Sequence, residues 1–236
     1  MTLLALETST SHSSVALLAE GRLQAEEFFP SQMSLGRTLP GHIQAVLATC
    51  GLGPEDLQGI AVAIGPGSFT GMRVGVATAK ALAHGLEIPL VGIPTHETLA
   101  WPLCFAGEAG ICVIQHARKT DVYTTTFSCS GDGPVESVPC AVVPLRDLLE
   151  RIARENQPPT LVGDGVERHA AQIAQAVGEK ARVAPGPLSA PRAAVVGAIA
   201  QTRIQQADTD AAFSLRPMYV LASQAERTHG IDLGMG

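Results

Sequence analysis

The chain begins with the stretch LLALETSTSHSSVALLA at residues 3–19, in which two apolar runs flank a turn rich in hydroxyl side chains. The runs Leu3–Glu7 and Val15–Ala19 have the length and composition of buried strands, so we predict a hairpin, with Arg22–Phe29 as a third strand. Apolar residues then recur at steps of three and four through residues 35–47. This spacing predicts a helix with one apolar face.

The same order of elements recurs in the second half of the chain. After the first helix we expect a strand, a helix and a strand at Gly59–Ile64, Gly71–His84 and Pro89–Ile93. The second half reads as three strands, a helix, a strand and two helices at Ile111–His116, Val122–Phe127, Val138–Val143, Leu145–Glu155, Thr160–Gly163, Val166–Val177 and Pro191–Gln206. Strands that alternate with helices after a meander predict mixed sheets with helices on their faces.

This repetition predicts an α/β protein of two lobes. We place the N-terminal lobe at 1–100 and the C-terminal lobe at 101–212, with the boundary near Thr98–Gly110. We expect residues 213–222 to return to the first lobe and residues 223–236 to form a loose tail.

The composition excludes several classes of protein. Of the 236 residues, 46% are hydrophobic and 16% are charged, which is typical of a chain with a real core and not of a disordered one. The net charge is −6, and no basic run is present, so independent binding of tRNA or DNA is not expected. The longest stretches without charged residues, Thr38–Pro54 and Leu57–Met72, are interrupted by glycine and proline, so no membrane span is predicted.

The N-terminal sequence and the cysteine pattern predict a cytoplasmic protein. The N-terminus has no basic region and reaches Glu7 too early for a signal peptide. The five cysteines are odd in number and contain no C-x-x-C pair. We therefore expect reduced, mostly buried thiols in a cytoplasmic protein.

The most specific motif is GPGSFTGMR at residues 65–73, between a predicted strand and a predicted helix. Backbone N–H groups at such a position can meet an anion, and the hydroxyl-rich turn after the first strand can add donors to phosphate oxygens. The segment lacks the Gly-Lys-Ser/Thr of a Walker A loop, and a tight strand-to-helix turn explains it equally well. The candidate nucleotide or phosphate residues are Thr8, Ser9, Thr10, Gly65, Gly67, Ser68, Thr70, Gly71 and Arg73.

The helix after this motif carries small residues at steps of four: Gly71, Gly75, Ala79 and Ala83. Such a stripe lets another element approach closely, either a helix of a partner or the chain's own sheet. Glycine inside a helix costs about 0.5–1 kcal/mol relative to alanine, so Gly75 requires one of these two contacts as its reason.

No metal site and no catalytic residue is predicted. The histidines stand at positions 12, 42, 84, 96, 116, 169 and 229, where no two are four residues apart, and no cysteine–histidine cluster has zinc spacing. No serine or cysteine has a recognisable base for nucleophilic catalysis.

The segments LALETST at 4–10, GPGSFTGMRVG at 65–75 and RPMY at 216–219 resemble the TsaB (YeaZ) family. The resemblance covers nearly the whole chain. It implies two ribonuclease-H-like lobes of the actin-like (hexokinase/Hsp70-type) ATPase fold. It also implies a role in making N6-threonylcarbamoyladenosine at position 37 of tRNAs, as a non-catalytic scaffold and activator without activity alone, within the threonylcarbamoyl transferase complex.

The resemblance also implies partners for this chain. The helices at about Leu35–Leu47 and Gly71–Leu82 would contact the TsaD-type transferase or, in its absence, a second copy. The implied interface residues are Leu35, Leu39, Ile43, Leu47, Met72, Gly75, Val76, Ala79 and Leu82. A small ATPase subunit would join the complex, tRNA would bind only through the complex, and ATP or ADP would bind at or near the partner interface, with no intrinsic cofactor.

This sequence departs from the family pattern at two turns. The family usually has aspartate where Glu7 stands, and Asp-Ala-Arg where Gln115-His116-Ala117-Arg118 stands. A Mg·ATP site would use carboxylates near both turns, so these changes disfavour phosphotransfer. Two alternative functions are an independent small-molecule kinase or ATPase of the same fold, and a peptidase.

Overall fold

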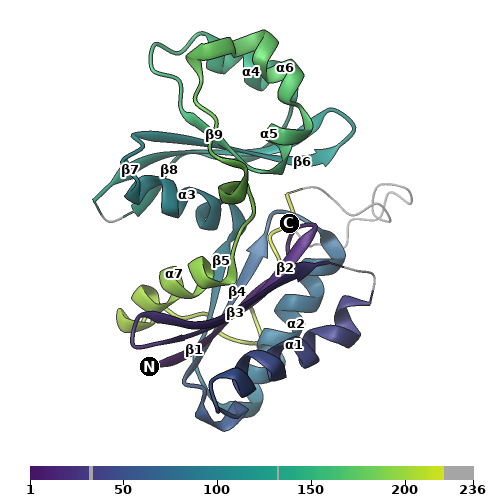
Figure 1. Ribbon diagram of the computed structural model, residues 1–236, viewed down its shortest axis with the longest axis vertical. Helices are drawn as coiled ribbons and strands as arrows, with labels where there is room; N and C mark the ends of the chain where they lie inside the picture. The colour runs from purple at the N-terminus through teal and green to yellow at the C-terminus, as the bar shows by residue number, and fades with distance from the viewer. Residues whose placement is uncertain (32–33, 132, 221–236) are drawn as a thin grey trace. The chain divides into compact units, whose positions relative to one another are not determined.

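The computed structural model describes residues 1–31, 34–131 and 133–220 of the chain (Figure 1). The chain divides into two compact units, one formed by Met1–Thr98 with Pro191–Met218 and the other built on Leu99–Ala190. Among the described residues, no helix is both long and apolar enough to cross a membrane.

The first unit is built on a five-stranded sheet in the order β3-β2-β1-β4-β5. Its strands are β1 (Thr2–Glu7), β2 (His12–Ala19), β3 (Arg22–Pro30), β4 (Gly59–Gly65) and β5 (Leu90–Pro94). The first three strands form an antiparallel meander, whereas β1, β4 and β5 are parallel. Parallel neighbours require crossover connections, which here contain α1 (Leu35–Thr49) and α2 (Phe69–Leu86).

Helices cover both faces of this sheet. Side chains alternate along a strand, so Leu4 and Leu6 of β1 point to the core beneath α1 and α2, while Ala5 points to α7 (Ala193–Gln205) on the other face. Figure 1 shows α1 and α2 side by side along the first sheet. The predicted helix over 35–47 is confirmed, and it begins at Leu35 with Pro40 inside it.

The assignment of the last helix to the second lobe is wrong. α7 packs on the first sheet, where Gly197 has no room for a side chain against Leu18 and Ala5. Arg192 at its start forms two hydrogen bonds with Glu26 of β3, at 3.2 and 2.7 Å. The chain order placed the helix after the elements of the second lobe, but its apolar composition does not specify which sheet it covers.

Residues after α7 remain with the first unit as far as Met218. Leu215 belongs to the core beneath α1 and α2, and the backbone N–H of Met218 donates to Ile64 at 2.7 Å. The predicted tail at 223–236 lies outside the described residues.

The second unit repeats the topology of the first. Its sheet has the order β8-β7-β6-β9, with strands β6 (Gly110–Arg118), β7 (Asp121–Ser130), β8 (Gly133–Pro144) and β9 (Thr160–Val162). β6, β7 and β8 form an antiparallel meander, and β9 is parallel to β6. This order matches β3-β2-β1-β4 of the first sheet, which confirms the repeated order of elements predicted from the sequence.

Helices also cover both faces of the second sheet. On one face Leu99 and Leu103 of α3 (Thr95–Phe105) form a core with β6. On the other face lie α4 (Leu145–Ala153), α5 (Asp164–Arg168) and α6 (Ala170–Val177). The single helix predicted over 166–177 is therefore two helices that meet at His169, and α3 was not predicted.

The expectation that all five cysteines are free thiols is wrong. Cys104 in α3 and Cys129 in β7 form a disulfide, with Cα atoms 5.1 Å apart. Cys50, Cys112 and Cys140 are not in disulfides. The pair is 25 residues apart in sequence, and only the packing of α3 on the second sheet brings the two sulfur atoms together.

Candidate functional site

The predicted phosphate residues gather at the carboxyl ends of the parallel strands in the first unit. This edge of the sheet carries Thr8 and Ser9 after β1, the glycine-rich loop after β4, and Thr95 after β5. Ligands of parallel α/β sheets usually bind at this edge. The structure therefore brings together residues that lie far apart in the sequence.

The glycine-rich loop is packed tightly on the turn after β1. The backbone N–H of Ser68 donates to the carbonyl of Ser9 at 2.7 Å. A side chain at Gly67 would overlap the Ser9 carbonyl oxygen, and a side chain at Gly71 would overlap that of Thr8. Glycine is thus required at both positions for the loop to approach the turn.

The hydroxyl groups of the turn are bound inside the protein. The Thr8 hydroxyl donates to the Gly71 carbonyl at 2.9 Å, and the Thr95 hydroxyl donates to Ser9 Oγ at 2.8 Å. Both the backbone N–H and the hydroxyl of Ser9 donate to Glu7 Oε1, each at 2.6 Å. Thr8 and Ser9 are fully buried, so these predicted phosphate ligands bind the loop to the sheet instead.

The other predicted phosphate residues divide into buried and accessible ones. Gly65 and Gly71 are buried. Thr10 and Gly67 are half-buried, and Ser68, Thr70 and Arg73 are exposed at the start of α2. Ser68 caps this helix, since its side chain accepts from the Gly71 backbone N–H at 3.3 Å.

Glu7 is the charged group at the centre of this edge. Its side chain is fully buried, Oε1 accepts the two bonds from Ser9, and Oε2 has no hydrogen-bond partner among the described residues. Burial raises its pKa to about 7, although the bonds from Ser9 favour the ionised form. In the absence of a bound cation, the carboxyl group is therefore partly protonated near neutral pH.

The corresponding strand of the second unit ends differently. Gln115 and His116 lie in the last half of β6, which ends at Arg118, and Gln115 is buried. Its amide carries no charge for a cation, as expected from the sequence. No group of three or more His, Cys, Asp or Glu side chains with metal-binding geometry occurs within residues 1–31, 34–131 and 133–220.

The predicted interface residues are packed in the chain's own core. Seven of them are buried, and Gly75, also buried, leaves no room for a side chain against the hydroxyl of Thr8. Only Leu82 is half-buried. The buried side chains are Leu35, Leu39, Ile43, Leu47, Met72, Val76 and Ala79.

This arrangement decides between the two readings of the small-residue stripe. The stripe lets α2 approach β1 of its own sheet, so Gly75 is explained without a partner helix. Periodicity showed that α1 and α2 each have an apolar face, but it did not show what that face contacts.

The outer faces of α1 and α2 are nevertheless unusual for exposed helices. Arg37 and Arg73 are the only charged side chains at the exposed positions of these two helices. The exposed residues of the two helices include a set of small or uncharged ones: Gly41, Gln44, Ala45, Ala48, Ala77 and Ala81. We call these six residues the outer face.

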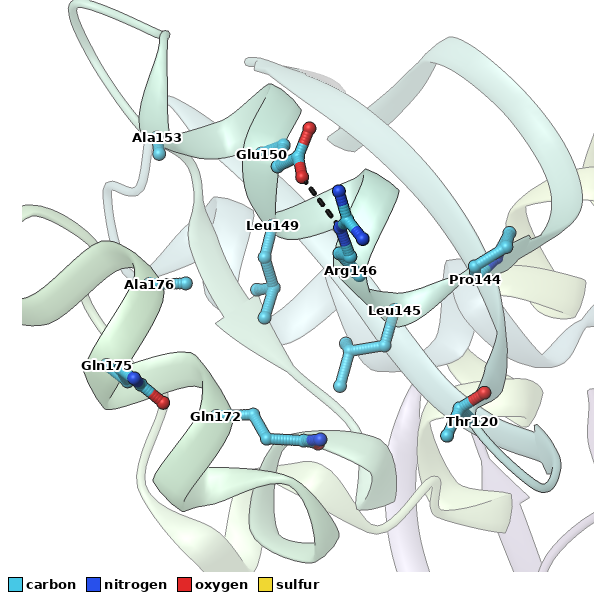
Figure 2. A pocket seen from close by; sticks show the side chains of 10 residues that line it. All are labelled: Thr120, Pro144, Leu145, Arg146, Leu149, Glu150, Ala153, Gln172, Gln175 and Ala176. Carbon is cyan, nitrogen blue, oxygen red and sulfur yellow. Dashed lines mark hydrogen bonds and ion pairs between the residues drawn. The ribbon is translucent and has the colours of Figure 1, made fainter.

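The second unit contains a groove of about 610 Å³ between α4 and α6 (Figure 2). Leu145 and Leu149 form its apolar floor, and Gln172 and Gln175 project from α6 on the opposite side. Arg146 Nε lies 2.9 Å from Glu150 Oε1, so the one guanidinium of the groove is already paired. Among the described residues that line the groove, no unpaired cation is available for a phosphate group.

The chain is similar to known proteins over nearly its full length. A family model described as TsaD, tRNA N6-adenosine threonylcarbamoyltransferase, matches residues 32–227. The tRNA threonylcarbamoyladenosine biosynthesis protein TsaB of Bacillus subtilis is 32% identical over 229 residues, which is 96% of each chain. The chain belongs to the TsaB/YeaZ family. TsaB of Escherichia coli is 39% identical over 136 residues, 56% of this chain and 58% of its own.

Solved structures show the same fold. A Pseudomonas aeruginosa protein described as similar to the peptidase YeaZ has a TM-score of 0.77 and 24% identity, covering 93% of this chain and 99% of its own. The ethanolamine utilization protein EutJ of Carboxydothermus hydrogenoformans has a TM-score of 0.50 at 12% identity, covering 84% and 90%. This TsaB-family chain therefore has the α/β fold of two ribonuclease-H-like units that was predicted.

Proposed function

We propose that this TsaB-family protein is a non-catalytic subunit in the synthesis of N6-threonylcarbamoyladenosine in tRNA, and that it binds a TsaD-type transferase in the cytoplasm. The observation that carries the proposal is the outer face of α1 and α2, which consists of uncharged and mostly small residues. Small side chains allow two helix pairs to approach closely, and interface centres are poor in charge. Family membership supports the choice of partner.

The polar groups at the edge of the first sheet favour a structural role over catalysis of phosphotransfer. A phosphotransferase needs free donors for phosphate oxygens and carboxylates for a cation. Here the hydroxyls of Thr8 and Ser9 are internally bonded, and Glu7 is buried with a raised pKa. These contacts support a subunit that leaves the chemistry to its partner.

The family resemblance implies the other members of the complex. The net charge of −6 gives tRNA little electrostatic attraction to this chain, so tRNA would bind mainly through the partner. In the absence of the transferase, the outer face would bind a second copy of the chain. A small ATPase subunit would complete the assembly, and ATP or ADP would bind at or near the partner interface.

The test is light scattering on a sizing column with the TsaD homologue of the same organism. We expect the 24.5 kDa chain to form a one-to-one complex with it. The variants Ala45→Glu and Ala77→Glu place a carboxylate on the outer face, where burial without a partner is unfavourable, so each should weaken association at least tenfold.

A matched control uses the same substitution on the second unit. Ala174→Glu lies at an exposed position of α6, outside the outer face, and should leave association unchanged. Equal weakening by all three variants would reject the outer face as the interface. No association of the wild-type chain, with or without ATP, would reject the partner role itself and favour an independent kinase or ATPase.

A further inference from the structure

Two histidines of the second unit, far apart in the sequence, lie close together in the structure. His116 is near the end of β6, and His169 lies between α5 and α6. Their ring centroids are 5.9 Å apart, with the ring planes inclined at 43°. His116 Nδ1 and His169 Nε2 are both buried, and neither has a hydrogen-bond partner among the described residues.

Buried ring nitrogens without a partner are rare, and each requires an explanation such as a bound ion or water. The neighbouring Gln172 indicates which nitrogen of His169 is the acceptor. His169 Nδ1 lies 3.0 Å from Gln172 Oε1, and an amide oxygen can only accept, so Nδ1 carries the proton. Nε2 of the neutral ring then holds a free lone pair, and a histidine that ligates a metal usually donates its other N–H in this way.

The surroundings of His116 also favour a neutral ring. Burial and the nearby charge of Arg168 lower the pKa of His116. The Asp164 carboxylate lies beside the ring, where its Oδ1 accepts from the His116 backbone N–H at 2.9 Å. The carboxylate partly offsets the charge of Arg168.

The separation of the rings fits a shared metal ion. A bond of about 2.1 Å from nitrogen to zinc places a ring centroid roughly 3.2 Å from the ion, so two imidazoles on one tetrahedral ion have centroids about 5–6 Å apart. The observed 5.9 Å lies within this range.

We propose that His116 Nδ1 and His169 Nε2 together bind one divalent transition-metal ion, with Zn²⁺ as the expected occupant. Imidazole nitrogen is a preferred ligand of Zn²⁺ and of Ni²⁺. Within the described residues no third side chain completes a cluster with metal-binding geometry, so water fills the other coordination positions. The site therefore binds an exchangeable ion. It does not depend on the function proposed above.

The experiment is a titration of the metal-free full-length protein with Zn²⁺, followed by competition with a chromophoric chelator. We expect one ion per chain. His116→Gln and His169→Gln should each weaken binding at least tenfold, and the double variant should abolish it. His84→Gln, at an exposed position of the first unit, should bind as the wild type does.

A second pair of variants separates the metal site from a general effect on α6. Gln172→Ala removes the partner of His169 Nδ1 and should weaken Zn²⁺ binding ten- to hundredfold, the usual effect of removing such a support. Gln175→Ala removes the neighbouring glutamine that lines the same groove (Figure 2) and should have no effect.

A measurement on the wild-type protein covers the case in which variants fail to fold. Nitrogen NMR of the imidazole rings should show Zn²⁺ shifting His116 Nδ1 and His169 Nε2 and no other ring nitrogens. Shifts at other histidines, binding that persists in the double variant, or no binding below millimolar Zn²⁺ would overturn the proposal and leave water as the partner of both atoms.

Discussion

The two units share one topology but end their first strands with different chemistry. In both, a glycine at the start of the helix that follows the parallel strand lies close to a backbone carbonyl of the unit's first strand or of the residue after it: Gly71 against Thr8, directly after β1, and Gly165 against Ile114, within β6. In the first unit Glu7 and the hydroxyls of Thr8 and Ser9 lie there, whereas in the second unit Gln115 and His116 of β6 lie there, with His169, from between α5 and α6, beside His116.

The fold itself requires the glycine at the start of the helix, whether or not a ligand binds nearby. The glycine contact occurs in the second unit without the hydroxyl-rich turn, so a glycine at this position is not by itself evidence for phosphate binding. The side chains that follow the first strand differ between the units, and they are where specific chemistry can lie.

The largest expected effect comes from filling the contact between α2 and β1. Gly75→Leu forces a side chain into the position of the Thr8 hydroxyl, so we expect the free energy of unfolding to fall by about 4 kcal/mol or more. Urea denaturation followed by circular dichroism measures it. Ala77→Leu, exposed on the same helix, should change stability little, and a well-folded Gly75→Leu with weakened association would show instead that the stripe faces a partner.

The second prediction gives β1 of the first unit the uncharged amide that Gln115 supplies in β6 of the second. A carboxyl group with a pKa of about 7 when folded and 4.5 when unfolded binds extra protons in the folded state, so stability falls as the pH rises through this interval. The loss amounts to roughly 3 kcal/mol by pH 8. Glu7→Gln resembles the protonated acid and should avoid this loss.

The two proteins should therefore have similar stability at pH 5 and diverge above it, with the variant more stable at pH 8. Urea denaturation at a series of pH values gives both curves. Parallel curves would mean that Glu7 Oε2 has a compensating partner, such as a bound cation, when the protein is in solution.

The sequence predicted the order of elements because periodicity depends on local burial, which the two halves share. It did not predict the Cys104–Cys129 bond or the His116–His169 pair, since each depends on two elements meeting in three dimensions. The position of α7 was missed for a related reason. An apolar helix is compatible with either sheet, and only tertiary packing decides which one it covers.

The candidate site shows the same limit at the level of single residues. The structure places the glycine-rich loop and the turn after β1 at one sheet edge. Spacing marked each of them only as a candidate phosphate-binding segment. It could not show that the Thr8 and Ser9 hydroxyls bond within the protein, because hydroxyls at a turn have the same sequence pattern whether they face solvent or backbone.

The smallest expected effect tests whether the glycine contact is a property of the fold. Gly165 in α5 has helical backbone, so alanine there gains roughly 0.5–1 kcal/mol of helix propensity, but its Cβ would lie 2.8 Å from the Ile114 carbonyl oxygen. We expect a net loss of about 1–2 kcal/mol in the free energy of unfolding.

Gly41 in α1 has helical backbone and no neighbour within 4 Å among the described residues, so the control variant Gly41→Ala should stabilise the chain by about 0.5–1 kcal/mol. Urea denaturation measures both changes in the free energy of unfolding. Changes of opposite sign would show that glycine is required at position 165 because Ile114 lies so close. Stabilisation by both variants would mean that only the first unit requires glycine at this contact.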